Sequence, residues 1–150
     1  MSQNPSLIVI PKYSSKGIVK THQIQFDKQF PRMLHHSLDT EEYAEILKYI
    51  ETIVNRMFKD FFNAQKIKIL YNIPILVIPV VNLYRHSSLK LNYKKQVLVL
   101  ESNIDAFITQ LNDELFLEEY GINIISYWES VKDGRSTGVR RELRIIFNLI

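Results

Sequence analysis

The sequence predicts a single α+β domain spanning residues 1–150, in which an antiparallel sheet of about four strands packs against two amphipathic helices. Segments with strand patterns occur at both ends of the chain, two near each terminus, and two segments with helical periodicity lie between them. Between the helices, residues 69–84 contain no charged side chain but do contain Pro74 and Pro79. Because proline bends a helix, we expect a kinked apolar helical segment there.

The two N-terminal strands are short. Residues Leu7–Ile10 form an apolar run closed by a proline, which is typical of an edge strand. Residues His22–Asp27 alternate apolar and polar side chains, the period of a half-buried strand. We expect these two strands to pair as a hairpin across the turn-rich residues 13–17, and Phe30-Pro31 to end this part of the sheet.

The clearest helix is expected over Asp39–Phe62. Asp39 lies three residues before Glu42, which is the spacing of a capping box. Apolar residues then follow at helical spacing and form one broad stripe: Tyr43, Ile46, Leu47, Ile50, Ile53, Val54, Met57, Phe58 and Phe61. This stripe predicts packing against the core or against another helix.

A second amphipathic helix is expected over about Lys94–Glu119, with Gly121 as the residue that ends it. Residues Ile122–Trp128 and Val139–Leu149 are expected to form a hairpin, with its turn within residues 132–138.

Within the last predicted strand, Arg141 falls on the same face as Leu143 and Ile145. An unpaired buried charge is costly, so we expect Arg141 to have a buried carboxylate or carbonyl partner. These features make Arg141 the best single candidate for an interface anchor. The basic residues around it are interpreted as a solvated face, a surface for lipid headgroups or an acidic partner, or an RNA-binding surface.

Residues 69–84 are expected to be buried, in the fold, against a partner or in lipid. Burying one aliphatic side chain stabilises a protein by roughly 1.5–3 kcal/mol, and this run contains many of them. The run is short for a membrane span, and Lys66, Lys68 and Arg85 flank it as in interfacial segments. A buried core element (a kinked helix or a strand through Ile75–Val81), a segment bound to a membrane or partner, and a span all remain open. The side chains expected to form a membrane or partner surface are Ile69, Leu70, Ile73, Ile75, Leu76, Ile78, Val80, Val81 and Leu83.

The residue pattern predicts no catalytic, metal or cofactor site. The chain has no cysteine, and it contains neither a phosphate-binding glycine loop nor a nucleophile elbow. His35 and His36 would point apart on a helix or strand and so make a poor metal pair. The pairs at 41–42 and 118–119 are glutamates expected in solvated helix positions.

Three groups of motifs, in this order, resemble the golgin subfamily A member 7 and Ras-modification accessory-subunit (Erf-type) family. The first group is IVIPKYSS at 8–15 and QFDKQFP at 25–31. The second is LDTEEYAEILKYIETI at 38–53. The third is the ending, with ESNIDAFITQLNDELF, GINIISYW and RRELRIIFNL.

This resemblance implies a non-catalytic accessory subunit of a DHHC-type protein S-acyltransferase, peripheral to the cytoplasmic face of the endoplasmic reticulum or Golgi membrane. Such a subunit stabilises the enzyme and its acylated intermediate, and the pair acylates Ras-type substrates. The matching positions, expected to bind the partner, are Gln25, Phe26, Phe30, Pro31, Arg141 and Arg144.

Animal members carry acylated cysteines near the central segment, and this chain has none. Residues 69–84 alone would then have to supply the affinity for membrane or enzyme. No cofactor, nucleic acid or small-molecule substrate is implied. The alternative is a small ligand-binding or RNA-binding α+β module that uses the apolar central segment or the basic C-terminal hairpin.

Overall fold

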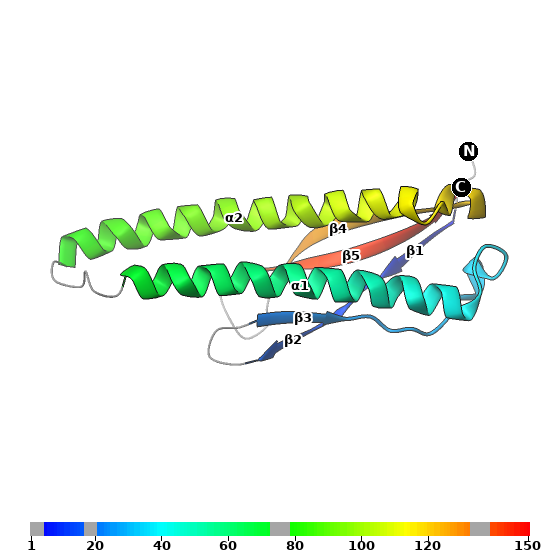
Figure 1. Cartoon of the computed structure of the whole chain (residues 1–150), viewed down its shortest axis with the longest axis horizontal. Helices are drawn as coiled ribbons and strands as arrows, with labels where there is room; N and C mark the ends of the chain where they lie inside the picture. Colours follow the sequence, from blue (N-terminus) through cyan, green and yellow to red (C-terminus); the bar gives the residue numbers. More distant parts are fainter. Residues whose placement is uncertain (1–4, 17–20, 73–78, 133–138) are drawn as a thin grey trace.

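The structure is a computed structural model that describes residues 5–16, 21–72, 79–132 and 139–150. It confirms the α+β fold class. Two long helices lie over one face of a three-stranded antiparallel sheet, and a second sheet of two strands lies beside the first helix (Figure 1).

The larger sheet contains β1 (Ser6–Val9), β4 (Ile122–Lys132) and β5 (Val139–Leu149), in the order β1-β5-β4. The β4–β5 hairpin is the one expected from the sequence, although β4 runs four residues beyond Trp128. Its turn lies outside the described residues. Apolar side chains on the helix-facing side of this sheet are the fully buried Ile122, Ile124, Leu143, Ile145 and Phe147.

The predicted N-terminal hairpin is wrong. β1 pairs with β5, with Leu7 opposite Phe147, whereas β3 (Thr21–Gln25) pairs with β2 (Lys12–Lys16), a segment interpreted as a turn. The sequence of β2, KYSSK, has no apolar alternation, so only the backbone pairing with β3 reveals it as a strand. The expected sheet of about four strands is therefore five strands in two sheets among the described residues.

Helix α1 (Thr40–Asn72) begins at the predicted capping box. The Glu42 backbone N–H donates to Asp39 Oδ1 at 2.7 Å, and the Asp39 N–H donates to Glu42 Oε2 at 3.0 Å. Most of the predicted apolar stripe is buried in the core: Tyr43, Ile46, Leu47, Ile50, Val54 and Phe58. Ahead of α1, Pro31 leads into the short 3₁₀ helix η1 (Arg32–Leu34).

Helix α2 (Pro79–Glu114) packs on β4 and starts with a proline, which suits the first turn of a helix. It ends five residues before the predicted Glu119. Phe116 takes a left-handed conformation at φ 51°, and the 3₁₀ helix η3 (Leu117–Tyr120) follows. Gly121, at φ 71°, ends η3 rather than α2.

Only the two ends of the central apolar run are described, and they belong to the two long helices rather than to a separate segment. Residues 69–72 belong to α1, residues 79–84 belong to α2, and residues 73–78 lie outside the described part. The end of α1 and the start of α2 lie together, past the end of the sheet (Figure 1). Among the described residues, no helix combines the length and apolar character needed to cross a membrane.

Two asparagines fasten the helices to edge strands. On α1, Asn55 accepts the Ile24 N–H at 2.7 Å and donates to the Ile24 carbonyl at 3.0 Å. On α2, Asn112 makes the same two bonds to Ile124, each 2.7 Å long. Because β3 and β4 are edges of their sheets, these amides bind backbone groups to which the described residues offer no further strand.

Candidate functional site: an apolar groove between the helices

The four predicted partner-binding residues near the N-terminus have different surroundings. Gln25 is exposed at the end of β3, whereas Phe26 is a core residue with 3% exposure, and its N–H donates to Glu51 Oε2 at 3.1 Å. Phe30 is half-buried and packs its ring edge-on against a core tyrosine at 5.7 Å. Pro31, partly buried, precedes η1. Of these four, Phe26 is enclosed by the fold and Gln25 lies open at the surface.

Arg141 has the carboxylate partner expected from the sequence. Its Nε lies 2.7 Å from Glu101 Oε1, and the Glu101 side chain is 8% exposed. Arg141 Nη1 also donates to Ser130 Oγ at 3.0 Å. The ion pair joins β5 to α2, so Arg141 holds the sheet and helix layers together. Its role as a partner contact stays a prediction.

Arg144 lies on the opposite face of β5 from Arg141. Its Nη1 is 2.6 Å from Glu129 Oε2 on β4, and its Nε is 3.5 Å from Glu142 Oε1. The two arginines therefore do not share one surface. The structure does not bring the predicted partner-binding residues into a single site.

The nine aliphatic side chains of residues 69–83 that we expected to form a membrane or partner surface are outside the described part. Four of them, Ile73, Ile75, Leu76 and Ile78, lie within residues 73–78. For the other five, in the helices, only the backbone is described. Their role stays a prediction.

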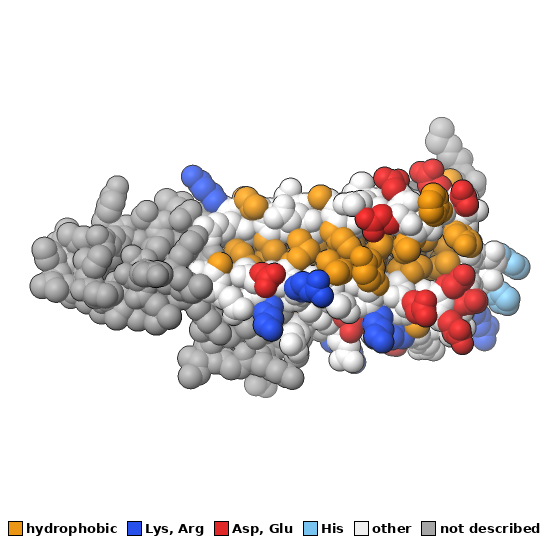
Figure 2. All heavy atoms as spheres, in the orientation of Figure 1, with side chains coloured by type: hydrophobic (Ala, Val, Ile, Leu, Met, Phe, Trp, Pro, Cys, Tyr) orange, Lys and Arg blue, Asp and Glu red, His pale blue; other side chains and the backbone are white. Residues whose placement is uncertain are grey.

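The structure adds an apolar surface that sequence reasoning missed. Figure 2 shows an apolar strip between α1 and α2 on the side of the helices away from the sheet. Large apolar side chains exposed on these helices and on the turn after α2 are Tyr49, Leu98, Val99, Leu115, Phe116 and Tyr120. One sequence signal could have indicated it. Leu98 and Val99 follow Val97 directly, so the apolar residues of α2 extend beyond the face that the sheet covers.

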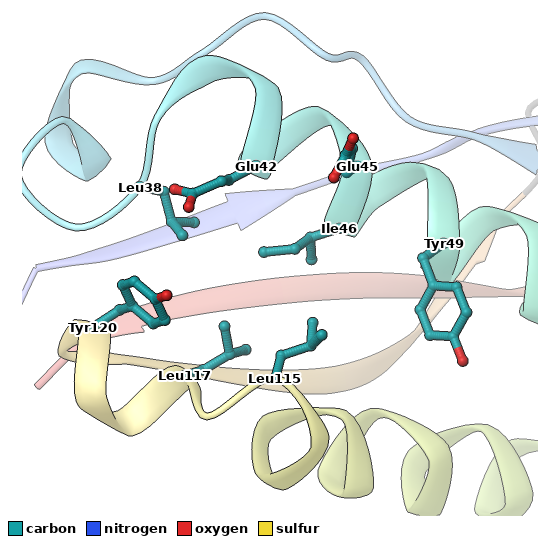
Figure 3. A pocket seen from close by; sticks show the side chains of 8 residues that line it. All are labelled: Leu38, Glu42, Glu45, Ile46, Tyr49, Leu115, Leu117 and Tyr120. Carbon is teal, nitrogen blue, oxygen red and sulfur yellow. The ribbon is translucent and has the colours of Figure 1, made fainter.

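At the start of α1 and the end of α2 the strip widens into a groove of about 310 Å³. Leu38, Ile46 and Tyr49 line it from α1 and the residues before it; Leu115, Leu117 and Tyr120 line it from the opposite side (Figure 3). Glu42 and Glu45 lie at its α1 side. This arrangement provides a hollow apolar surface with carboxylates at its border.

Farther along the helix pair lies a second, more open hollow of about 440 Å³. Met57 and Phe61 of α1 line it, with Val99 and Leu100 of α2. On the helix pair, the Tyr49 and Phe107 rings pack with centroids 5.9 Å apart. The apolar surface therefore includes hollows at two places on one helix pair.

The titratable groups of the described residues form no metal site. His35 and His36 do not point apart as predicted: their rings stack with centroids 5.5 Å apart, because a turn follows η1 at this point. No group of three His, Asp or Glu side chains comes close enough to hold a metal within the described ranges. Burial raises the pKa of the Tyr43 phenol to about 12, and the negative charge of Asp27 adds to this rise.

These features define a class: a small α+β protein whose long helix pair carries an open apolar groove. In a scan of known protein families, no family matches the chain, and a search of curated proteins finds no match either.

Proposed function

We propose that this chain is a non-catalytic accessory subunit of a DHHC-type protein S-acyltransferase, bound at the cytoplasmic face of the endoplasmic reticulum or Golgi membrane. One support is the resemblance of its sequence to that family of subunits. The structural observation that carries the proposal is the apolar surface between α1 and α2. It lies on the side away from the sheet, where no other described element of the chain covers it (Figure 2).

The exposure of this surface favours a partner-bound state. Val99, which lines the more open hollow, is 58% exposed, and Tyr49, which lines the groove, is 44% exposed. Removing apolar surface from water stabilises a complex by about 25 cal/mol per Å². Large exposed apolar patches on soluble proteins mark interaction sites.

The uncharged run at residues 69–84 supports contact at the far end of the helix pair. Its first four and last six residues belong to α1 and α2, and these helix ends project past the sheet (Figure 1). Lys66, Lys68 and Arg85 flank the run in the sequence, which suits an anionic membrane surface. In our proposal this end meets the enzyme and the bilayer.

In the proposed complex, the absence of cysteine from this chain decides which protein carries the acyl group. A thioester-linked acyl group needs a cysteine, and this chain has none. The acyl group would therefore stay on the enzyme while the subunit stabilises the loaded form. A partner that binds only the folded enzyme stabilises it by about 2.7 kcal/mol at a hundredfold excess over Kd. Ras-type substrates follow from the sequence resemblance alone.

The experiment is co-expression with a DHHC acyltransferase, followed by affinity capture and size-exclusion chromatography in detergent. We expect the chain to be poorly soluble alone and monodisperse with the enzyme. The complex should also keep the acyl-enzyme loaded for longer than the enzyme alone does. A stable, soluble monomer that binds no such enzyme would contradict the proposal.

Aspartate substitutions locate the contact. Tyr49→Asp and Val99→Asp test the described apolar surface, and Leu76→Asp and Val80→Asp test the central run. Each should abolish co-purification with the enzyme. The matched control is Ile8→Asp, because Ile8 is 52% exposed on β1 and lies on the sheet face away from the helices. Retained binding by all four test variants would exclude both surfaces as the contact.

The two alternative functions have less structural support. Arg141 and Arg144 each pair with a carboxylate, which reduces the positive charge that the C-terminal hairpin offers to RNA phosphates. The described hollows are open grooves rather than the deep cavity that a small-ligand carrier requires. Nucleic-acid binding that weakens steeply with salt would favour the RNA-binding alternative.

A further inference from the structure

The groove at the start of α1 and the end of α2 is acidic as well as apolar. Residues of the stretches 38–49 and 115–120 line it, and every Asp, Glu, Lys or Arg in these two stretches is acidic except Lys48. The whole chain, by contrast, has a net charge of +3. Figure 2 shows acidic side chains on both sides of the apolar strip at this end. The local negative charge therefore belongs to this groove and not to the protein in general.

Two of these carboxylates line the groove itself. Glu42 accepts the Asp39 N–H with one oxygen, Oε2, in the capping box, so its position is fixed by the helix start. Glu45 is exposed one helical turn farther on. Leu115 and Leu117 line the opposite side of the groove (Figure 3). A molecule bound in the groove therefore contacts apolar side chains inside it and carboxylates at its α1 border.

We infer that this groove binds a basic amphipathic helix of a partner protein, with its apolar residues in the groove and its Lys or Arg side chains facing Glu42 and Glu45. An apolar strip between two long helices is the surface on which a third helix lays its apolar face. The acidic border selects a basic partner and repels anionic lipid headgroups. The groove is at the opposite end of the helix pair from residues 69–72 of α1 and 79–84 of α2. The inference holds whether or not the partner is an acyltransferase.

A synthetic probe tests the charge selection. One labelled peptide carries Leu at helical positions i, i+3, i+4 and i+7 with Lys elsewhere, and its twin carries Glu in place of each Lys. In fluorescence anisotropy titrations of the full chain, kept in solution by mild detergent, the Lys peptide should bind at least about tenfold more tightly than the Glu peptide. Added salt should weaken its binding. Equal affinity for the two peptides, or no binding of either, would overturn the inference.

A double substitution locates the site. Glu42→Gln with Glu45→Gln removes both groove carboxylates, and glutamine still serves in a capping box. Affinity for the Lys peptide should fall roughly 2- to 30-fold, which is the range expected for two exposed charge pairs. The control, Gln23→Lys with Asn63→Lys, changes the net charge equally at exposed positions that do not line the groove. An equal loss in the control would show that only overall charge matters and would refute the site.

Two further measurements distinguish other occupants. Leu115→Ser should weaken binding of the Lys peptide without changing the circular dichroism of the chain, because Leu115 is 37% exposed. Sedimentation velocity should show no dimer that depends on Glu42 and Glu45. A dimer abolished by the double glutamine variant would assign the groove to a second copy of this chain. Binding to phosphatidylserine vesicles that Leu115→Ser weakens as strongly as it weakens peptide binding would assign the groove to lipid. Either result would overturn the inference.

Discussion

The Asn112 side chain on α2 binds both backbone groups of Ile124 on β4, with two hydrogen bonds of 2.7 Å each. The Asn112 amide also donates to the Ile108 carbonyl at 3.3 Å, one turn earlier in its own helix. A buried amide that satisfies an edge strand in this way fixes the register between helix and sheet. Asn55 and Ile24 repeat the arrangement on α1 and β3.

The first prediction is that Asn112→Ala and Asn55→Ala each destabilise the protein. Each change leaves a backbone N–H and a carbonyl without their side-chain partner, which costs about 1–3 kcal/mol in the free energy of unfolding. Urea denaturation measures this loss. Asn63→Ala, at an exposed position on α1, is the control and should change stability by less than about 0.5 kcal/mol. If the free energy of unfolding falls no more than in the control, water fully replaces the hydrogen bonds of the asparagine side chain.

The second prediction concerns the Arg141–Glu101 ion pair. Arg141→Ala leaves the buried Glu101 carboxylate without its partner, so the free energy of unfolding should fall by about 1–3 kcal/mol. The arginine is 43% exposed, which places the effect below that of a fully buried pair. Adding Glu101→Gln should recover part of the loss, because it removes the unpaired charge.

Urea denaturation of the two single variants and the double variant forms the cycle that isolates the coupling between Arg141 and Glu101. Strictly additive effects would show that the pair contributes no coupling. Enzyme capture by a folded Arg141→Ala variant reports separately on partner contact. Full capture would limit Arg141 to its structural role.

The third prediction is a loss of stability at alkaline pH that depends on Tyr43. The pKa of its phenol is about 12 in the folded protein and about 10 in the unfolded chain, so the folded state favours the neutral form. Stability from this group is full below about pH 10 and declines as the pH rises toward 12. Denaturation across this range should show a steeper decline for the natural chain than for Tyr43→Phe. Identical slopes would refute the shift.

The fourth prediction is that Phe116→Gly stabilises the protein. Phe116 is 65% exposed and has φ 51°, a left-handed conformation that costs a residue with a side chain about 1–2 kcal/mol. Glycine removes this strain but is more flexible when unfolded, so we expect a net gain of about 0.5–1 kcal/mol by thermal or urea denaturation. Leu115→Gly should lower stability, because positive φ occurs only at Phe116 and Gly121 among the described residues. Destabilisation by Phe116→Gly would show that the ring packs favourably.

Sequence patterns predicted the elements that depend on neighbouring residues. The capping box of Asp39 and Glu42 and the apolar stripe of α1 are set within one or a few helical turns, and the structure contains both. The β4–β5 hairpin joins strands that are close in the chain, and it too was predicted. The need of Arg141 for a carboxylate followed from its place among apolar neighbours, but nothing local identified Glu101, which lies 40 residues away.

The candidate site was not predictable in the same way. The residues that were predicted to bind a partner, from the family resemblance, do not lie together. The fold places them in the core, at the surface and on both faces of β5. The groove takes its lining from residues 38–49 and 115–120, two stretches that come together only when α1 and α2 pack side by side. No pattern within either stretch specifies that packing.

The sequence by itself determined that residues 40–62 and 94–114 are helical, where α1 starts, and that the last two strands pair, because those features depend on contacts within a short length of chain. Tertiary structure alone decided that β1 joins β5, that β2 is a strand, and that an acidic apolar groove lies between the helix ends. The physical reason is that pairing and packing between distant segments depend on the complementary surfaces of whole elements. Those surfaces exist only once the elements have formed and met.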